Sequence, residues 1–137
     1  MSVANTIKDE EGFRPTIYKD TRGIWTLGYG FNVDPDHGGN IPRIVADFWA
    51  DFEVNERREQ LIRRWAPFVV QPLDVQDALV QLAYQIGVDG LLGFKLMLAA
   101  LQRGDRATAA AEALNSDWQK QTPARAERVA ALMRGEA

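Results

Sequence analysis

The sequence contains no cysteine and only one histidine, His37. Without cysteine the chain can form no disulfide and can use no thiolate as a nucleophile or metal ligand. One imidazole cannot build a histidine-based metal cage, and a Ser-His-Asp triad would depend on His37 without any GxSxG motif to supply its serine. Carboxylates and hydroxyls are therefore the groups that remain available for catalysis.

The chain also lacks a long hydrophobic run and an excess of positive charge. No apolar stretch approaches the about 20 residues of a membrane-spanning helix. The opening residues, MSVANTIKDEEG, lack the basic flank and apolar segment of a secretory signal. The net charge of −3 argues against nucleic acid as the main partner, since phosphate binding needs a basic surface. We expect a protein made in the cytoplasm, without stable membrane insertion and without a nucleic acid partner.

Length and composition are those of one globular domain. The chain has 137 residues, of which 46% are hydrophobic and 26% are charged. A chain of this size buries about 68% of the surface that its unfolded form exposes, which is enough for one hydrophobic core. We see no linker, repeat or low-complexity segment, so residues 1–137 are expected to form a single domain.

A short helix is predicted first, followed by a small β-ribbon. The segment SVANTIKDEE offers Ser2 as an N-cap, places Val3 and Ile7 one turn apart, and precedes a stop at Gly12. Next, TIY is typical of a strand, KDTRG of a turn and IWTLGYG of a returning strand. The beginning of the chain is therefore predicted to be mixed α and β.

The returning strand has one face that is nearly bare. Successive side chains of a strand point to opposite faces. One face therefore carries the large side chains of Trp25, Leu27 and Tyr29. The other carries Ile24, Thr26, Gly28 and Gly30, two of which have no side chain. Glycine weakens a strand unless a ligand or another backbone must approach it closely. The surroundings of Thr26 are therefore a candidate site.

The segment NVDPDHGGN is predicted to be a loop. Its Asp34, Asp36 and His37 suggest metal binding at first sight, but no glutamate stands where a calcium loop needs its bidentate ligand. We interpret the segment as a solvated turn, assign His37 no role, and expect no metal.

From Ile41 onwards the hydrophobic pattern becomes helical. Pro42 suits the first turn of a long helix through NERREQLIRR, with a break possible near Phe52 to Asn55. Further helices are predicted for LDVQDALVQLAYQIG, ended by Gly87, for GFKLMLAALQRG, for RATAAAEAL, and for QTPARAERVAALM with Thr122 as N-cap. The dense LVQLAYQI and LMLAAL segments are expected to be core.

Two carboxylates flank the predicted ribbon. Glu11 ends the first helix and Asp20 lies in the turn, nine positions further on. Across a gap, such a pair could cleave a glycosidic bond, with one acid protonated and the other ionised. Spacing alone favours the plainer interpretation of a helix-end acid and a turn residue, because aspartate is common in turns.

Three blocks of sequence stand out together: IKDEEGFRPTIYKDTRGIWTLGYG at residues 7–30, AYQIGVDGLLGF at 83–94 and SDWQKQTPARAERV at 116–129. In this order they resemble the phage-type lysozymes of the T-even phage family, glycoside hydrolase family 24. The middle of the chain, from Phe31 to Gln81, matches poorly. The resemblance implies an α+β, predominantly α, lysozyme-like fold: a small β-ribbon lobe at about 13–40, a helical lobe at about 66–137 with helix 1 packed on it, and the active-site cleft between the lobes.

The resemblance implies a muramidase that hydrolyses the β-1,4 bond between N-acetylmuramic acid and N-acetylglucosamine in peptidoglycan. Glu11 matches the catalytic acid, Asp20 the carboxylate that activates a water, and Thr26 the hydroxyl that places it. To keep its proton, Glu11 should lie in a poorly solvated wall, whereas Asp20 stays wet and ionised. Room for a water between the two carboxyls would give inversion, which the resemblance favours.

Four further residues are expected to bind substrate: Gly30, Tyr84, Gln85 and Arg125. Tyr84 and Gln85 match an aromatic and an amide of the central helix, which suit the apolar face and the acetamido group of a sugar. Tyr84 could equally be a core residue. Arg125 matches an arginine that reaches the catalytic glutamate and orients it, although a solvated arginine near a helix start is a close alternative.

The resemblance implies an endolysin that needs no cofactor and acts as a monomer. A membrane pore formed by a holin-like protein would let it pass from the host cytoplasm to the wall. Three alternatives remain open: a non-catalytic module that binds wall glycans, a lytic transglycosylase, and a purely structural helical protein. The acidic balance should weaken binding to the anionic wall.

Overall fold

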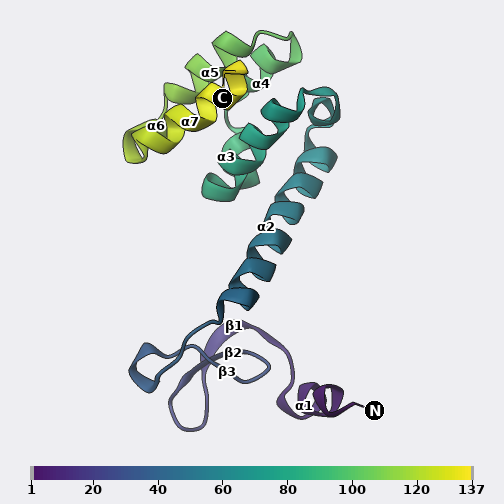
Figure 1. Ribbon diagram of the computed structural model, residues 1–137, viewed down its shortest axis with the longest axis vertical. Coiled ribbons are helices and arrows are strands. Elements are labelled where there is room, and N and C mark those ends of the chain that lie inside the picture. Colours follow the sequence, from purple (N-terminus) through teal and green to yellow (C-terminus); the bar gives the residue numbers. More distant parts are fainter. Residues whose placement is uncertain (1, 137) are drawn as a thin grey trace. The chain divides into compact units, whose positions relative to one another are not determined.

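The computed structural model describes residues 2–136, which form helices and one small antiparallel sheet (Figure 1). The fold is α+β and predominantly α, as predicted. The chain divides after Phe48 into two compact units. We call the residues up to Phe48 the N-terminal unit and those from Trp49 onwards the C-terminal unit. That helix 1 packs on the helical lobe, and that a cleft separates the lobes, remain predictions.

The N-terminal unit begins with α1, Val3–Glu11. Ser2 caps this helix by accepting a hydrogen bond from the Asn5 backbone N–H at 3.1 Å. Gly12 ends it with a positive φ of 71° and donates its N–H to the Lys8 carbonyl at 2.9 Å. Both predicted boundaries are confirmed, and Glu11 is the last residue of the helix.

Three strands follow in the spatial order β1-β2-β3, each antiparallel to its neighbour. They are β1 (Arg14–Lys19), β2 (Trp25–Gly28) and β3 (Phe31–Asn32). The register pairs Thr26 with Tyr18 on one side and with Asn32 on the other. The first two strands were predicted. The third was missed because it is only two residues long and overlaps the start of the segment predicted as a loop.

The bare strand face is filled by neighbouring side chains. A Cβ added to Gly28 would lie 2.8 Å from the Phe31 ring, and one added to Gly30 would lie 2.6 Å from a carboxyl oxygen of Glu11. Gly28 and Thr26 are both buried. The glycines were therefore correctly interpreted as points of close approach, but at Gly28 the approaching group is a ring of the same sheet.

After β3 the chain forms the short 3-10 helix η1, Pro35–His37, and then α2, Arg43–Arg64. The break considered near Phe52 to Asn55 is wrong, because α2 runs through these residues without interruption. Side-chain pairs one turn apart, Trp49 with Glu53 and Glu53 with Arg57, bridge this stretch. The periodicity of the apolar face weakens there while the backbone remains helical.

The C-terminal unit contains the hydrophobic core. Its elements after α2 are η2 (Ala66–Val70), α3 (Leu73–Leu92), α4 (Lys95–Gln102), α5 (Arg106–Leu114), α6 (Asp117–Gln121) and α7 (Pro123–Arg134). Helix α7 packs against α3 and α5, and α5 also packs against α4 (Figure 1). The largest side chains with almost no exposed surface are Phe68, Leu61, Leu79, Leu82, Leu91, Met97 and Met133. The LVQLAYQI and LMLAAL segments contribute to this core as predicted.

Gly87 and Thr122 are two of the residues predicted to bound helices in this unit. Gly87 interrupts α3 with φ 82° and ψ 159°, as expected, but the chain resumes helical structure up to Leu92. Thr122 occupies the N-cap position of α7, as predicted, and its backbone carbonyl accepts the Ala126 N–H at 2.9 Å. Its hydroxyl makes no capping hydrogen bond, because it donates to the Trp118 carbonyl at 3.2 Å and accepts from the Gln85 amide at 3.1 Å.

No single helix within residues 2–136 has the length and apolarity to cross a membrane. Helices α3 and α4 meet that test only when taken together, and they are bent by 97° at the break between them.

Candidate active site

The seven predicted site residues fall into two groups, one in each unit. Glu11, Asp20, Thr26 and Gly30 lie around the β-ribbon of the N-terminal unit. Tyr84, Gln85 and Arg125 lie on α3 and α7 of the C-terminal unit.

Glu11 lies against the backbone of Gly30. The close approach is possible because Gly30 has no side chain: an added Cβ would lie 2.6 Å from Glu11 Oε2 and 3.0 Å from its Cδ. Gly30 also has a φ of +74°, which favours glycine. Glu11 is exposed, so the residues of its own unit do not provide the poorly solvated wall that we expected.

Asp20 folds back over its own turn. Its Oδ1 accepts hydrogen bonds from the backbone N–H groups of Arg22 at 2.8 Å and Ile24 at 2.9 Å. The Arg22 guanidinium lies 3.7 Å from the other carboxyl oxygen. The Ile24 N–H, then the Arg22 N–H and the Arg22 charge, hold the pKa of Asp20 below its usual value. Asp20 is therefore an anion near neutral pH, as its predicted role requires.

Thr26 is the second residue of β2 and is only 4% exposed. Its Oγ1 donates a hydrogen bond to the Ile24 carbonyl at 2.8 Å. Because that donor is used within the protein, the hydroxyl can hold a water only by accepting one of its hydrogens. Ile24 thus connects the two predicted catalytic groups: its N–H is bound by Asp20 and its carbonyl by Thr26.

Asp34 is a buried acid that the sequence analysis placed in a solvated turn. It is 4% exposed, its Oδ2 accepts the Trp25 N–H at 3.2 Å, and its Oδ1 accepts the Asp36 N–H at 3.0 Å. His37 Nδ1 lies 3.2 Å from Asp34 Oδ2. The Trp25 N–H is the main cause of a lowered pKa for Asp34, aided by the Asp36 N–H and by His37. The interpretation of Asp34 as a solvated turn residue is therefore wrong, whereas His37 is exposed, as that interpretation expects.

A signal for this arrangement was present in the sequence. Aspartate followed by proline is a common way to cap a short helical turn, and Asp34 precedes Pro35 in this way. What the sequence did not indicate is that the same carboxylate reaches back across the sheet to Trp25.

Tyr84 lies on the surface of the C-terminal unit. It is 43% exposed, so the alternative that it is a core residue is wrong. The Arg57 guanidinium from α2 lies 5.7 Å from the centre of its ring, and Arg57 also forms an ion pair with Glu53. Arg57 was missed because nothing in the sequence pairs α2 with this turn of α3. An exposed ring beside a cation can contact both a sugar face and an acidic group.

Gln85 uses its amide inside the protein. Trp118 Nε1 donates to Gln85 Oε1 at 2.9 Å, and Gln85 Nε2 donates to Thr122 Oγ1 at 3.1 Å. These bonds tie α3 to the segment that contains α6 and the start of α7. The amide keeps one N–H and one oxygen lone pair for a ligand. Gln85 is thus positioned firmly, with half of its hydrogen-bonding capacity remaining.

Arg125 lies in the first turn of α7 and is half-buried. Within residues 2–136 it takes part in no ion pair. Whether it reaches Glu11 remains a prediction.

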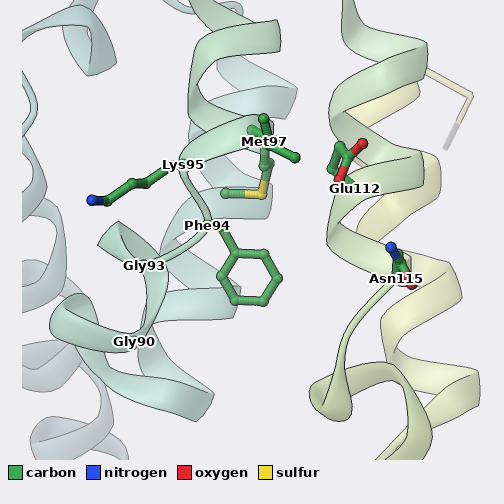
Figure 2. Close-up of a pocket in the computed structure, with 8 residues that line it drawn as sticks. Gly90, Gly93, Phe94, Lys95, Met97, Glu112 and Asn115 are labelled. Atoms are coloured by element: carbon green, nitrogen blue, oxygen red, sulfur yellow. The ribbon is translucent and has the colours of Figure 1, made fainter.

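The C-terminal unit also carries a surface hollow of about 460 Å³ between the turn before α4 and helix α5 (Figure 2). Its lining residues are Gly90, Gly93, Phe94, Lys95, Leu96, Met97, Glu112 and Asn115. In Figure 2 the Glu112 and Asn115 side chains come from α5 and its end, and Lys95 extends away from them. The hollow contains none of the predicted site residues.

Comparison with known proteins gives consistent results. Residues 8–135 match the family model described as phage lysozyme. Probable T4-type lysozyme 1 of Dictyostelium discoideum is 23% identical over 158 aligned positions, covering 96% of this chain and 93% of that protein. Probable T4-type lysozyme 2 of the same organism is 24% identical and covers 93% of this chain and 91% of that protein.

A third relative is the pre-baseplate central spike protein Gp5 of Enterobacteria phage T4. It is 29% identical over 97% of this chain, and the match spans 28% of Gp5. The fold, the ribbon with its carboxylates and the family match agree on one class of protein, the lysozyme-type glycoside hydrolases that act on peptidoglycan. The chain belongs to the phage lysozyme family.

Proposed function

We propose that the protein is an endolysin that hydrolyses the β-1,4 bond between N-acetylmuramic acid and N-acetylglucosamine for host cell lysis. Glu11 is the general acid, and Asp20 and Thr26 place and activate the attacking water, with inversion at the sugar carbon. The enzyme acts as a monomer without a cofactor and reaches the wall through a pore formed by a holin-like protein.

The observation that carries this proposal is the shared anchoring of the catalytic groups on the ribbon. Asp20 and Thr26 are bonded to the N–H and the carbonyl of the same residue, Ile24, at 2.9 and 2.8 Å. Glu11 lies at the other end of this ribbon, on the bare backbone of Gly30. A fixed anion and a fixed hydroxyl can hold a water, and a separate carboxyl can protonate the leaving oxygen.

The groups on α3 and α7 supply substrate binding in this proposal. The exposed Tyr84 ring offers an apolar face to a sugar, and the remaining N–H and lone pair of Gln85 suit an acetamido group. Arg125 orients the acid or an anionic part of the substrate, and Gly30, whose missing side chain lets the Glu11 carboxyl approach it, contributes to the sugar site beside Glu11.

Glu11→Gln is the decisive variant. Replacing the acid by an amide of the same shape removes the transferable proton, so wall clearing should fall by at least about 100-fold while the melting temperature stays the same. Glu10→Gln is the matched control, because Glu10 is the exposed neighbour on the same helix. Turbidity loss of permeabilised bacteria measures clearing, and new reducing ends measure hydrolysis. Unchanged clearing by Glu11→Gln would refute the assignment.

The products separate the remaining alternatives. Hydrolysis leaves a reducing sugar with the mass of one added water, whereas a lytic transglycosylase leaves an anhydro end. A non-catalytic module would bind walls without new ends of either kind. Mass spectrometry of digested wall fragments therefore tests the reaction class directly.

A further inference from the structure

Asp34 has no part in the proposed reaction, yet among the described residues of the N-terminal unit it is the buried acid. Both of its oxygens are used: Oδ1 by the Asp36 N–H, and Oδ2 by the Trp25 N–H and by His37 Nδ1. It is 4% exposed although it carries a charge. A buried carboxylate is retained only where its hydrogen bonds replace the lost water.

Asp34 completes the edge of the sheet where β3 leaves it. The Trp25 carbonyl accepts the Val33 N–H at 3.0 Å, so the backbone of Trp25 faces the β3 side. At the next residue the chain turns into η1, and its backbone can no longer pair with Trp25. The Asp34 side chain takes over as acceptor for the Trp25 N–H at 3.2 Å.

Two aspartates therefore hold two consecutive backbone amides from different segments. Asp20 in the β1–β2 turn holds the Ile24 N–H, and Asp34 after β3 holds the Trp25 N–H. The peptide that joins these two amides contains the Ile24 carbonyl, which is the hydrogen-bond acceptor for the Thr26 hydroxyl at 2.8 Å. That carbonyl also accepts the Asp20 backbone N–H at 2.9 Å, and its direction sets the direction in which the Thr26 hydroxyl donates its hydrogen.

The loop around Asp34 is built to keep this carboxylate in place. Asn32 Oδ1 accepts the Asp34 N–H at 2.9 Å, and Asn32 Nδ2 donates to the His37 carbonyl at 3.0 Å. The Asp34 carbonyl accepts the N–H groups of His37 at 3.1 Å and Gly39 at 2.7 Å. Gly39 packs so closely that an added Cβ would lie 2.3 Å from the Asp34 nitrogen. The carboxylate has little freedom to move.

We propose that Asp34 is a positioning residue, which fixes the Ile24–Trp25 peptide and thereby aims the Thr26 hydroxyl at the water held by Asp20. The proposal rests on the function proposed above for Thr26 and Asp20. It gives a role to a residue outside the predicted catalytic set, in a loop that the sequence analysis interpreted as a solvated turn. His37 supports Asp34 from the solvent side, where its side chain is 52% exposed.

The test compares Asp34→Asn with Asp36→Asn. Asp34→Asn replaces one carboxylate oxygen by an NH2 group, which cannot accept a hydrogen bond from the Trp25 or Asp36 N–H. Asp36→Asn alters an exposed acid two residues away, in η1. A misplaced catalytic group can cost about 100-fold in rate. On soluble peptidoglycan fragments, Asp34→Asn should lower kcat by about 10-fold or more with little change in KM, and Asp36→Asn should change neither. A rise in KM with kcat intact would overturn the proposal.

Combination with Thr26→Ala separates positioning from general destabilisation. If Asp34 acts through Thr26, Asp34→Asn should cost less than about threefold in kcat once the hydroxyl is gone. An equal loss in both backgrounds would mean that Asp34 only stabilises the fold, and would overturn the proposal.

A second measurement does not depend on enzymatic activity. The side-chain couplings of Thr26 and the amide shifts of Ile24 should change in the NMR spectrum of Asp34→Asn and stay unchanged in Asp36→Asn. Unchanged Thr26 signals in Asp34→Asn would refute the positioning role, whatever the reaction. If the wild type proves inactive while these signals shift, the proposed function fails and the positioning of Thr26 stands.

Discussion

The two units of the molecule are stabilised in different ways. The C-terminal unit contains every buried apolar side chain found in residues 2–136, from Leu61 to Met133. In the N-terminal unit the buried residues are Thr26, Gly28 and Asp34, two of which are polar. One unit is held by apolar packing, whose driving force has no preferred direction, and the other by hydrogen bonds, which require defined directions.

This difference matches the division of labour that we propose. A water that attacks a sugar must be held within a narrow range of positions, and carboxylate and backbone hydrogen bonds provide that precision. Binding a long glycan requires a stable surface that presents rings and amides, and a packed helical unit provides it. Substitutions in each unit test this difference.

The largest effect on stability is expected in the helical core. Leu79→Ala removes a fully buried side chain and should lower the free energy of unfolding by about 2–5 kcal/mol. Leu96→Ala in the same unit removes a side chain that is 66% exposed and should cost under about 0.5 kcal/mol. Urea unfolding of the two variants measures both values. Similar losses would mean that the apolar core does not dominate this unit.

A smaller loss is expected from the loop that holds Asp34. Gly39→Ala would place a Cβ 2.3 Å from the Asp34 nitrogen and should cost about 1–3 kcal/mol through displacement of the loop. In Gly38→Ala the added Cβ would point into open space. This variant should lose only about 1 kcal/mol of stability, because an alanine is strained at the positive φ of 75°. The enzymatic rate should fall in the first variant and persist in the second. Equal rates would show that the loop tolerates displacement.

Low pH should destabilise the N-terminal unit through Asp20 and Asp34. Backbone N–H groups, chiefly of Ile24 and Trp25, hold the pKa values of Asp20 and Asp34 below their usual range. Such groups add stability that is fully present above the unfolded pKa of about 3.9 and is lost as the pH falls through the folded pKa. The melting temperature should therefore fall below about pH 4, and less steeply in Asp34→Asn than in Asp36→Asn. Identical slopes would contradict this.

The smallest effect is expected at an exposed ion pair. Lys120 and Asp117 lie 3.7 Å apart with side chains that are 78% and 90% exposed. Lys120→Ala should change stability by under about 0.5 kcal/mol, because water and salt screen such pairs. A thermal melt at low salt is the most sensitive measurement. A shift of several degrees in the melting temperature would show that this exposed ion pair contributes more to stability than we expect.

Much of the fold could be predicted because its signals are local. Ser2, Gly12 and Gly87 mark helix boundaries through properties of single residues, and the apolar periodicity of α3 identified the core helix. Contacts between residues distant in sequence were not predicted. The Thr122 hydroxyl, for example, accepts a hydrogen bond from Gln85, 37 positions earlier, and makes no capping bond to α7.

The candidate site shows the same limit. Glu11, Asp20 and Thr26 were singled out by residue type and by resemblance, and the structure adds how Ile24 and Gly30 hold them. Asp34 was assigned to a solvated turn because composition reports only its neighbours, whereas its carboxylate bonds to Trp25, nine positions earlier. Tyr84 could not be assigned to core or surface, since its exposure depends on how α3 packs.

The sequence by itself determined the class of chemistry and the order of the elements. A chain without cysteine and with one histidine must rely on oxygen acids and hydroxyls, and caps and periodicity act within a few residues of one another. Only the tertiary structure decided which polar groups are buried and what they bind. The physical reason is that a hydrogen bond depends on the position and direction of both partners, and the return of β3 beside β2 brings Asp34 to Trp25.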